Sequence, residues 1–256
     1  TKQKVKQAMD ELHYRPNELA RSLSKQNTNT IGVITPHIMH PYFAQLISHI
    51  ENAASKQGFK IVLCNSKEDH SREAEYIDLC KSNRVAGIIF CGMILTSEKY
   101  AQLDFPFVAI ECNSPLCVST ILCDNYAGGR LAAEHLIEQG CRNLLHFSGI
   151  IGQEMPGDSR AQAFTDVCQK SKVNYDNVWT GDNTYYTMDY HEFIKQALLK
   201  HPKTDGIFAS SDLIAAQVIQ VCADLKKNIP EDMKLVGFDD VSLSTLTTPQ
   251  ITTIHQ

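Results

Sequence analysis

Short apolar runs alternate with helical patterns from residue 31 to the end of the chain, and this alternation constrains the fold more than any other feature. The expected strands comprise residues 31–34, 60–64, 87–90, 107–110, 120–122, 144–147, 206–209, 235–238 and 252–254. The expected helices between them include residues 43–56, 71–81, 126–138, 160–170, 188–199 and 213–225. Apolar strands that are separated by helices predict parallel sheets with both faces covered.

The number of strand runs favours two sheets over one. Nine runs are many for a single sheet, whereas a chain of 256 residues is long enough for two medium-sized domains. The runs at 107–110 and 120–122 follow one another with no helical pattern between them, which indicates a boundary there. We therefore expect two βαβ subdomains, comprising residues 31–123 and 124–256.

The first 30 residues differ from this body in pattern and in charge. Residues 3–12 carry apolar side chains at helical spacing, Pro16 breaks the pattern, and Asn17 is a favourable N-cap for a short second helix. Residues 1–26 have a net charge of +3, which leaves −8 for the remainder of the chain. A basic arm on an acidic body is the pattern expected when only the arm contacts nucleic acid.

The cysteines and the N-terminus bear on the cellular compartment. Nine cysteines are scattered along the chain without any C-x-x-C pair, which argues against a disulfide framework and favours a reducing cytoplasm. No apolar run approaches the roughly 20 residues that span a membrane, and the N-terminus lacks the apolar core of a signal peptide. The chain begins with Thr1 rather than Met, so we expect it to be a fragment of a longer protein.

Polar residues directly after the expected strands are the candidates for a ligand site, because parallel α/β sheets bind ligands at the carboxyl ends of their strands. Together with two aromatic residues, these are His37, His40, Tyr42, Phe43, Asn65, Glu111, Cys112, Asn113, Asp124, Ser148, Ser210, Ser211, Asp212, Asp239, Asp240 and Gln256. Carboxylates, amides and hydroxyls beside aromatic rings suit a polyhydroxylated ligand.

The sequence has no recognisable catalytic or cofactor-binding motif. It contains no G-x-G-x-x-G, G-x-x-x-x-G-K-[ST] or G-x-S-x-G, so dinucleotide, nucleotide and nucleophile-elbow sites lose their main support. His37 and His40 are three residues apart, but no further ligand has metal-site spacing, so we expect no metal. Asp239 and Asp240 could form a catalytic pair, although capping or hydroxyl binding is favoured. We therefore expect no enzyme activity and no cofactor.

Several short motifs together resemble the lactose-repressor family of bacterial transcription regulators. In chain order they are Tyr14-Arg15-Pro16-Asn17 with Ala20-Arg21-Ser22-Leu23, residues 31–34, Pro41-Tyr42-Phe43, Val85-Ala86-Gly87-Ile88-Ile89, Asp124-Asn125-Tyr126-Ala127-Gly128, Ser210-Ser211-Asp212, Val236-Gly237-Phe238-Asp239-Asp240 and Thr252-Thr253-Ile254-His255-Gln256. The resemblance implies two Rossmann-like parallel-sheet subdomains joined by crossover strands, with a fold like that of periplasmic sugar-binding proteins. It also implies a small effector in the cleft between the subdomains and a homodimer.

The resemblance assigns the N-terminal arm to DNA binding. Residues 1–14 are similar to the last part of a helix-turn-helix headpiece, and residues 15–30 are similar to the family's hinge helix and linker. The hinge helix would contact the minor groove of operator DNA and insert an apolar wedge between base steps. The hinge residues concerned are Arg15, Asn17, Ala20, Arg21 and Leu23. The chain is also expected to stop before the last elements of the family's N-terminal subdomain.

The resemblance also implies an effector site in the cleft. Its members are His40, Tyr42, Phe43, Glu111, Cys112, Asp124, Arg160, Asn183, Ser211, Asp239 and Gln256. The planar fork of Arg160 can hold a sugar ring oxygen and adjacent hydroxyls, and Glu111 can accept from two vicinal hydroxyls. Asp124 either contacts the ligand or caps the helix that begins near Tyr126.

Three of these positions depart from the family's pattern. Cys112 stands where a longer polar residue is frequent, Asn183 where an aromatic residue often stacks on the sugar, and Ser211 where Asn is frequent. A stacking ring could come instead from Tyr185 or Trp179. The identity of the effector therefore does not follow from the resemblance.

The predicted function is that of a ligand-responsive transcription regulator, a repressor, whose core binds a sugar and switches DNA affinity. Glu111 and Asp239 against Arg160 leave the cleft without surplus positive charge, which favours a neutral sugar over a phosphorylated one. The alternative is a solute-binding protein for sugar transport, which the basic arm, the polar N-terminus and the cysteines disfavour. An enzyme on a Rossmann-like scaffold is a third alternative.

Overall fold

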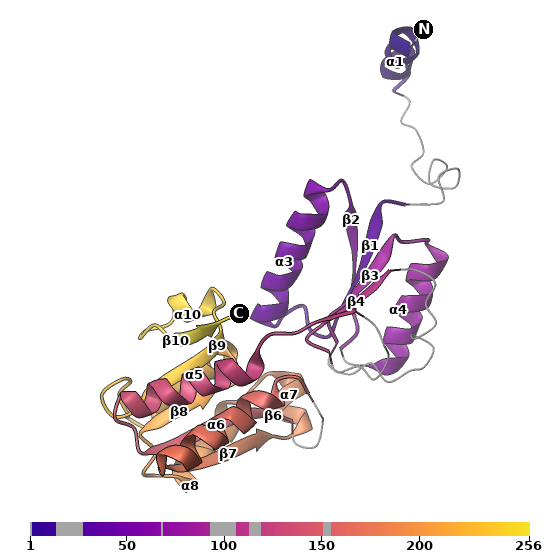
Figure 1. The fold of residues 1–256 in the computed structure, drawn as a ribbon. Coiled ribbons are helices and arrows are strands. Elements are labelled where there is room, and N and C mark those ends of the chain that lie inside the picture. Colours follow the sequence, from indigo (N-terminus) through magenta and orange to yellow (C-terminus); the bar gives the residue numbers. More distant parts are fainter. Residues whose placement is uncertain (1, 14–27, 68, 93–105, 113–118, 151–154) are drawn as a thin grey trace.

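The computed structural model describes residues 2–13, 28–67, 69–92, 106–112, 119–150 and 155–256. They form two parallel α/β sheets with flanking helices, preceded by the N-terminal helix α1 (Lys2–Glu11), which buries none of its residues (Figure 1). The predicted fold class is therefore confirmed. None of the helices in these ranges is both long and apolar enough to cross a membrane.

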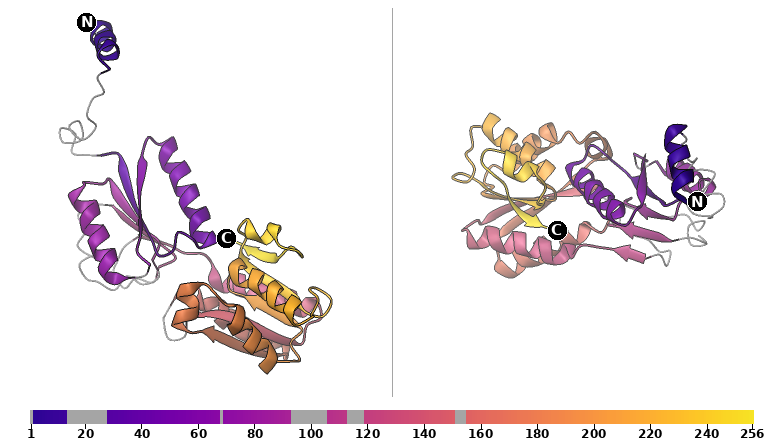
Figure 2. Two further views of the ribbon diagram at one scale, coloured as in Figure 1. Left: turned by 180° about the vertical axis from the view of Figure 1, so that it is seen from behind. Right: turned by 90° about the horizontal axis from the view of Figure 1, so that it is seen from above.

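The first sheet has the strand order β2-β1-β3-β4-β5, and every neighbouring pair is parallel. Its strands are β1 (Thr30–Thr35), β2 (Lys60–Asn65), β3 (Gly87–Phe90), β4 (Phe107–Ile110) and β5 (Ser119–Ile121). The chain moves outward from β1 to β2 and then back across β1 to β3. Right-handed crossovers in these two directions place α3 (Pro41–Lys56) and α4 (His70–Ser82) on opposite faces of the sheet (Figure 2).

The second sheet has the order β10-β9-β8-β6-β7 and is also parallel throughout. Its strands are β6 (Asn143–Ile150), β7 (Asn174–Thr180), β8 (Gly206–Ala209), β9 (Lys234–Asp239) and β10 (Thr252–His255). The helices of this part are α5 (Asn125–Glu138), α6 (Asp158–Ser171), α7 (Asp182–Thr187), α8 (His191–Lys200), α9 (Asp212–Asp224) and α10 (Leu243–Leu246).

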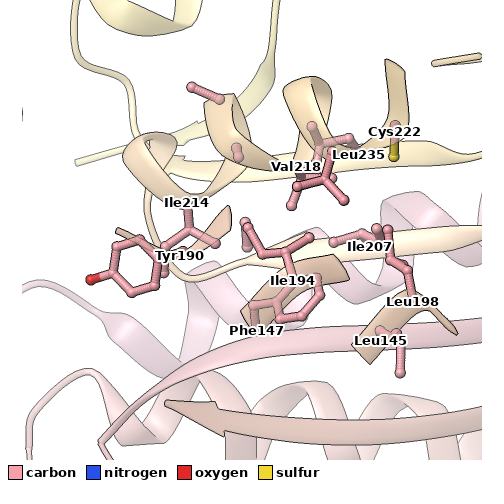
Figure 3. Close-up of a cluster of buried hydrophobic side chains, with 14 of the residues drawn as sticks. Leu145, Phe147, Tyr190, Ile194, Leu198, Ile207, Ile214, Val218, Cys222 and Leu235 are labelled. Atoms are coloured by element: carbon pink, nitrogen blue, oxygen red, sulfur yellow. The ribbon is translucent and has the colours of Figure 1, made fainter. Parts of the chain in front are cut away.

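Two apolar clusters hold helices to the two faces of the second sheet. One packs α8 and α9 on the sheet, and Figure 3 shows Tyr190 beside Ile214 at one end of it, with the tyrosine hydroxyl pointing away. The other cluster packs α5 and α6 on the opposite face through Phe164, Phe208 and Phe238. Burial of each large apolar side chain is worth about 1.5–3 kcal/mol, so the two clusters stabilise this layered arrangement.

A short connection joins the two sheets. Residues 122–124 lead from β5, the last strand of the first sheet, to α5, which packs on the second sheet. We propose this connection as the boundary between a first subdomain, residues 31–123, and a second subdomain, residues 124–256.

All nine predicted strands are present, but a tenth, β7, was not predicted. Its sequence, NYDNVWT, mixes polar and apolar side chains because β7 is an edge strand with both exposed and half-buried positions. The continuous helix expected over residues 188–199 is also wrong. Met188 adopts a left-handed conformation that ends α7, and α8 begins only at His191. The amide of Gln217 holds this break by bonding the Met188 carbonyl at 2.9 Å and the Tyr190 N–H at 2.7 Å.

Candidate functional site

The carboxyl ends of both sheets open on one cavity of about 140 Å³ that lies between the two sheets. Eight of the eleven residues predicted for the effector site line it, and they come from both halves of the chain. These residues are His40, Tyr42, Phe43, Glu111, Arg160, Ser211, Asp239 and Gln256. Residues that are far apart in the sequence therefore meet where parallel α/β sheets place their ligands.

The loop after β1 and the first turn of α3 supply three rings, those of His40, Tyr42 and Phe43. His40 is the N-cap of α3, since its Nδ1 accepts a hydrogen bond from the Tyr42 N–H at 3.3 Å, and Pro41 occupies the first helical position. The rings of Tyr42 and Phe43 meet edge to face with centroids 5.2 Å apart. Burial, assisted by nearby His37, lowers the pKa of His40 to about 4. His40 therefore presents a neutral imidazole to the cavity at physiological pH.

Glu111 follows β4 and is fixed by the connection between the subdomains. Its backbone is left-handed, with φ of 47°. One carboxylate oxygen accepts from the Cys123 N–H, and the other accepts from Nδ2 of Asn125 at 3.0 Å. Burial and the charge of Glu111 raise the pKa of the neighbouring Tyr42, which keeps its hydroxyl protonated.

Arg160 lies in the first turn of α6 and is held from three sides. Its Nε donates to Oδ1 of Asn125 at 2.7 Å, and its Nη1 donates to the carbonyl oxygen of Ser210 at 2.6 Å. The guanidinium carbon lies 3.5 Å from the centre of the Phe238 ring, within cation–π range. A guanidinium has five N–H donors, so this plane is fixed with donors left over for a ligand.

Asp239 is the last residue of β9 and another carboxyl group at the cavity. It is only 6% exposed, and Nε2 of Gln256 donates to its Oδ1 at 2.7 Å. Burial raises its pKa to about 8, against the opposing effect of the Arg160 charge. A carboxyl group with this pKa is largely protonated at neutral pH and can donate a hydrogen bond.

Further residues line the cavity that were not in the predicted site. Tyr185 of α7 is one of two rings considered for stacking, whereas Trp179 does not line the cavity. Tyr190 was missed because it precedes α8 inside a segment expected to be helical throughout. Thr180, at the end of the unpredicted strand β7, presents a buried Oγ1 that has no hydrogen-bond partner in the described part of the chain.

Three predicted members lie elsewhere or cannot be placed. Cys112 is buried in the core of the first sheet and does not line the cavity. Asp124 does not line the cavity either, and its side chain caps α5 by accepting from the Ala127 N–H at 2.9 Å. The side chain of Asn183 lies outside the described residues.

The hinge residues Arg15, Asn17, Ala20, Arg21 and Leu23 also lie outside the described residues.

Two neighbouring residues fix the start of α9. Ser211 is the N-cap, because its Oγ accepts from the Ile214 N–H at 3.3 Å. Asp212 is buried and accepts from the Val241 N–H at 2.9 Å and from Oγ1 of Thr253 at 2.6 Å. The carboxylate of Asp212 therefore ties the start of α9 to the ends of β9 and β10.

Two parallel α/β sheets whose carboxyl ends face a shared polar cavity define a two-lobed ligand-binding protein. Residues 28–256 match the family of periplasmic binding proteins and the sugar binding domain of the LacI family, and the chain belongs to this family. The resemblance predicted from the motifs is thus confirmed.

The chain is similar to known regulators over almost its whole length. The ribose operon repressor of Halalkalibacterium halodurans is 36% identical over 257 residues, which cover 98% of this chain and 75% of the repressor. The sucrose operon repressor of Pediococcus pentosaceus is 34% identical over 268 residues, covering 100% of this chain and 78% of the repressor. The crystal structure of a periplasmic binding protein/LacI transcriptional regulator from Alkaliphilus metalliredigens, complexed with D-xylulofuranose, is 33% identical. It has a TM-score of 0.79 and covers 89% of this chain and 84% of its own.

Proposed function

We propose that the chain is the effector-binding body of a transcription repressor and that its cavity binds a neutral monosaccharide. The observation that carries this proposal is the convergence of Glu111, Arg160 and Asp239 with the rings of Tyr42 and Phe43 on one small cavity. Carboxyl groups and a guanidinium bind hydroxyls, whereas aromatic rings cover the apolar face of a sugar.

The charges at the cavity favour a ligand without phosphate. Arg160 is the one Lys or Arg among the described lining residues, and Glu111 supplies a negative charge beside it. Phosphate sites generally offer several cationic or backbone N–H donors. A phosphorylated sugar would therefore meet too little positive charge here.

The size of the cavity favours a single sugar ring. Its volume of about 140 Å³ is below the roughly 300–1,000 Å³ of pockets for drug-sized ligands. The relatives support a small sugar in two cases, since one is a ribose operon repressor and one is complexed with D-xylulofuranose. Because another relative is a sucrose operon repressor, a disaccharide is the alternative ligand to be tested.

The N-terminal arm supports a role at operator DNA in the cytoplasm. Residues 1–14, which contain α1, resemble the end of a headpiece, and residues 15–30 resemble a hinge helix and linker. In this proposal two copies of the chain form a homodimer. The sugar then changes DNA affinity only through its different affinity for two arrangements of the subdomains.

A thermal-shift comparison tests the ligand class. We expect free D-ribose or D-xylulose to raise the melting temperature, since a ligand at 100 times its Kd adds about 2.7 kcal/mol to the free energy of unfolding. A shift with D-ribose 5-phosphate alone would refute the neutral ligand, and a shift with sucrose alone would refute the single ring.

Operator binding by full-length protein tests the regulatory role and separates it from solute transport. We expect the anisotropy of labelled operator DNA to respond to the same sugar that raises the melting temperature. A sugar that binds tightly and leaves the DNA affinity unchanged would favour the solute-binding alternative.

A further inference from the structure

We propose that Asn125 is the positioning residue of this site, holding Glu111 and Arg160 apart and directing both charged groups into the cavity. The proposal rests on the function proposed above. Asn125 is 4% exposed and does not line the cavity, whereas Glu111 and Arg160 both do. Asn125 therefore acts on a ligand only through these two side chains.

The side-chain amide of Asn125 uses both of its ends. Its Oδ1 accepts from Nε of Arg160 at 2.7 Å, and its Nδ2 donates to Oε2 of Glu111 at 3.0 Å. Glu111 belongs to the first subdomain, and Arg160 belongs to the second. The hydrogen-bonded series Glu111–Asn125–Arg160 therefore crosses the boundary between the subdomains beside the cavity.

Only a side chain with a donor and an acceptor can make both bonds. Aspartate at this position could still accept from Arg160, but it would repel Glu111, and leucine could do neither. No direct ion pair within 4.0 Å joins Glu111 to Arg160 among the described contacts. Without the Asn125 amide between them, the side chains of Glu111 and Arg160 can form an ion pair with each other instead of binding the ligand.

The glycines that follow Asn125 make the arrangement possible. Asn125 and Gly129 are one turn apart and lie on the same face of α5. A Cβ at Gly129 would lie 2.5 Å from the backbone oxygen of Arg160, and a Cβ at Gly128 would lie 2.6 Å from the Phe238 ring. Gly129 thus lets α5 approach α6 closely enough for the short asparagine side chain to reach Arg160, and Gly128 lets α5 approach β9.

Calorimetric titration of the full chain with D-ribose tests the proposal. We expect Asn125→Asp, which keeps the size of the side chain, and Asn125→Leu to weaken binding about tenfold or more. Asn174→Asp is the matched control, because Asn174 is an exposed residue of β7 that bonds Asn143 away from the cavity. Wild-type affinity in both Asn125 variants would overturn the proposal.

A double-mutant cycle distinguishes positioning from general stability. If Asn125 acts through Glu111, Asn125→Leu combined with Glu111→Gln should weaken binding by less than the product of the single effects. Effects that multiply would show that Asn125 acts independently of Glu111, which contradicts the proposal.

If D-ribose does not bind the wild-type chain, that result counts against the proposed ligand and not against the role of Asn125. Ligand-free crystal structures then test the role of Asn125. In Asn125→Leu we expect a direct ion pair between Glu111 and Arg160 with an N–O distance of about 4 Å or less. Asn125→Asp serves if the leucine variant does not fold, and there we expect the Glu111 carboxylate to move away from residue 125. Unchanged positions of both charged side chains would overturn the proposal.

Discussion

The guanidinium carbon of Arg160 lies 3.5 Å from the centre of the Phe238 ring, so the charged group at the cavity rests on the apolar core beneath it. Phe238 is fully buried in the cluster that packs α5 and α6 on the second sheet. The position of the ligand-binding donors therefore depends on core packing as well as on hydrogen bonds.

Replacing this ring should weaken sugar binding. We expect Phe238→Leu to reduce affinity about tenfold, because the cation–π contact is worth about 0.5–2 kcal/mol and the guanidinium loses its platform. Titration calorimetry measures the effect. Phe147→Leu is the control, since Phe147 is equally buried on the opposite face of the sheet and does not line the cavity. Equal loss of affinity in both variants would contradict a specific role for Phe238.

A methyl group at Gly129 should disturb both stability and binding. Its Cβ would meet the Arg160 backbone at 2.5 Å, and because backbone cannot rotate away, α5 and α6 must separate. We expect Gly129→Ala to lower the free energy of unfolding by about 1–3 kcal/mol and to weaken sugar binding. Gly181→Ala is the matched control, because nothing lies within 4 Å of its added Cβ. Urea unfolding checks the prediction, and equal stability of the two variants would contradict it.

Asp239 should make the protein less stable as the pH rises. The folded-state pKa of about 8 exceeds the ordinary value of 3.8, so the folded chain keeps a proton that the unfolded chain releases. The stabilising contribution is complete below pH 4 and is lost as the pH rises to about 8, with a slope of at most about 1.4 kcal/mol per pH unit. Asp239→Asn removes this slope, so its stability relative to wild type should be greater at pH 8 than at pH 5. Identical differences at the two pH values would contradict the prediction.

His146 should make the protein less stable as the pH falls, which is opposite to the effect of Asp239. Complete burial lowers its pKa from 6.5 to about 4, and its ring stacks on Phe208 with centroids 4.4 Å apart. The unfolded chain takes up a proton near pH 6.5 that the folded chain refuses, so stability falls as the pH drops from 6.5 toward 4. His146→Phe loses the bond from Nδ1 to the Phe208 carbonyl but should flatten this acid limb in urea unfolding. An unaltered acid limb in that variant would show that His146 does not cause it.

The sequence predicted the elements of the fold because each apolar strand and amphipathic helix carries its own local pattern. It did not predict β7, whose edge position allows polar side chains, or the break before α8, which depends on the distant Gln217. In the candidate site too, the sequence predicted individual residues but not the contacts that depend on the folded structure. Glu111 was named because it follows an expected strand, and the family resemblance assigned both Glu111 and Arg160 to the site, whereas the bridging bonds of Asn125 arise only when residues 111, 125 and 160 come together in space.

The central claim is that Arg160 holds a neutral monosaccharide in the cavity between the subdomains. The most direct test is calorimetric titration of the wild-type chain and of Arg160→Lys with D-ribose, D-xylulose and D-ribose 5-phosphate. We predict that a free sugar binds the wild type more tightly than the phosphate ester. Arg160→Lys, which keeps the charge but loses the planar fork, should bind that sugar about 10- to 100-fold more weakly. Arg130→Lys, in an exposed pair with Glu134, should bind as the wild type does. Tighter binding of the phosphate ester, or full affinity in Arg160→Lys, would contradict the claim.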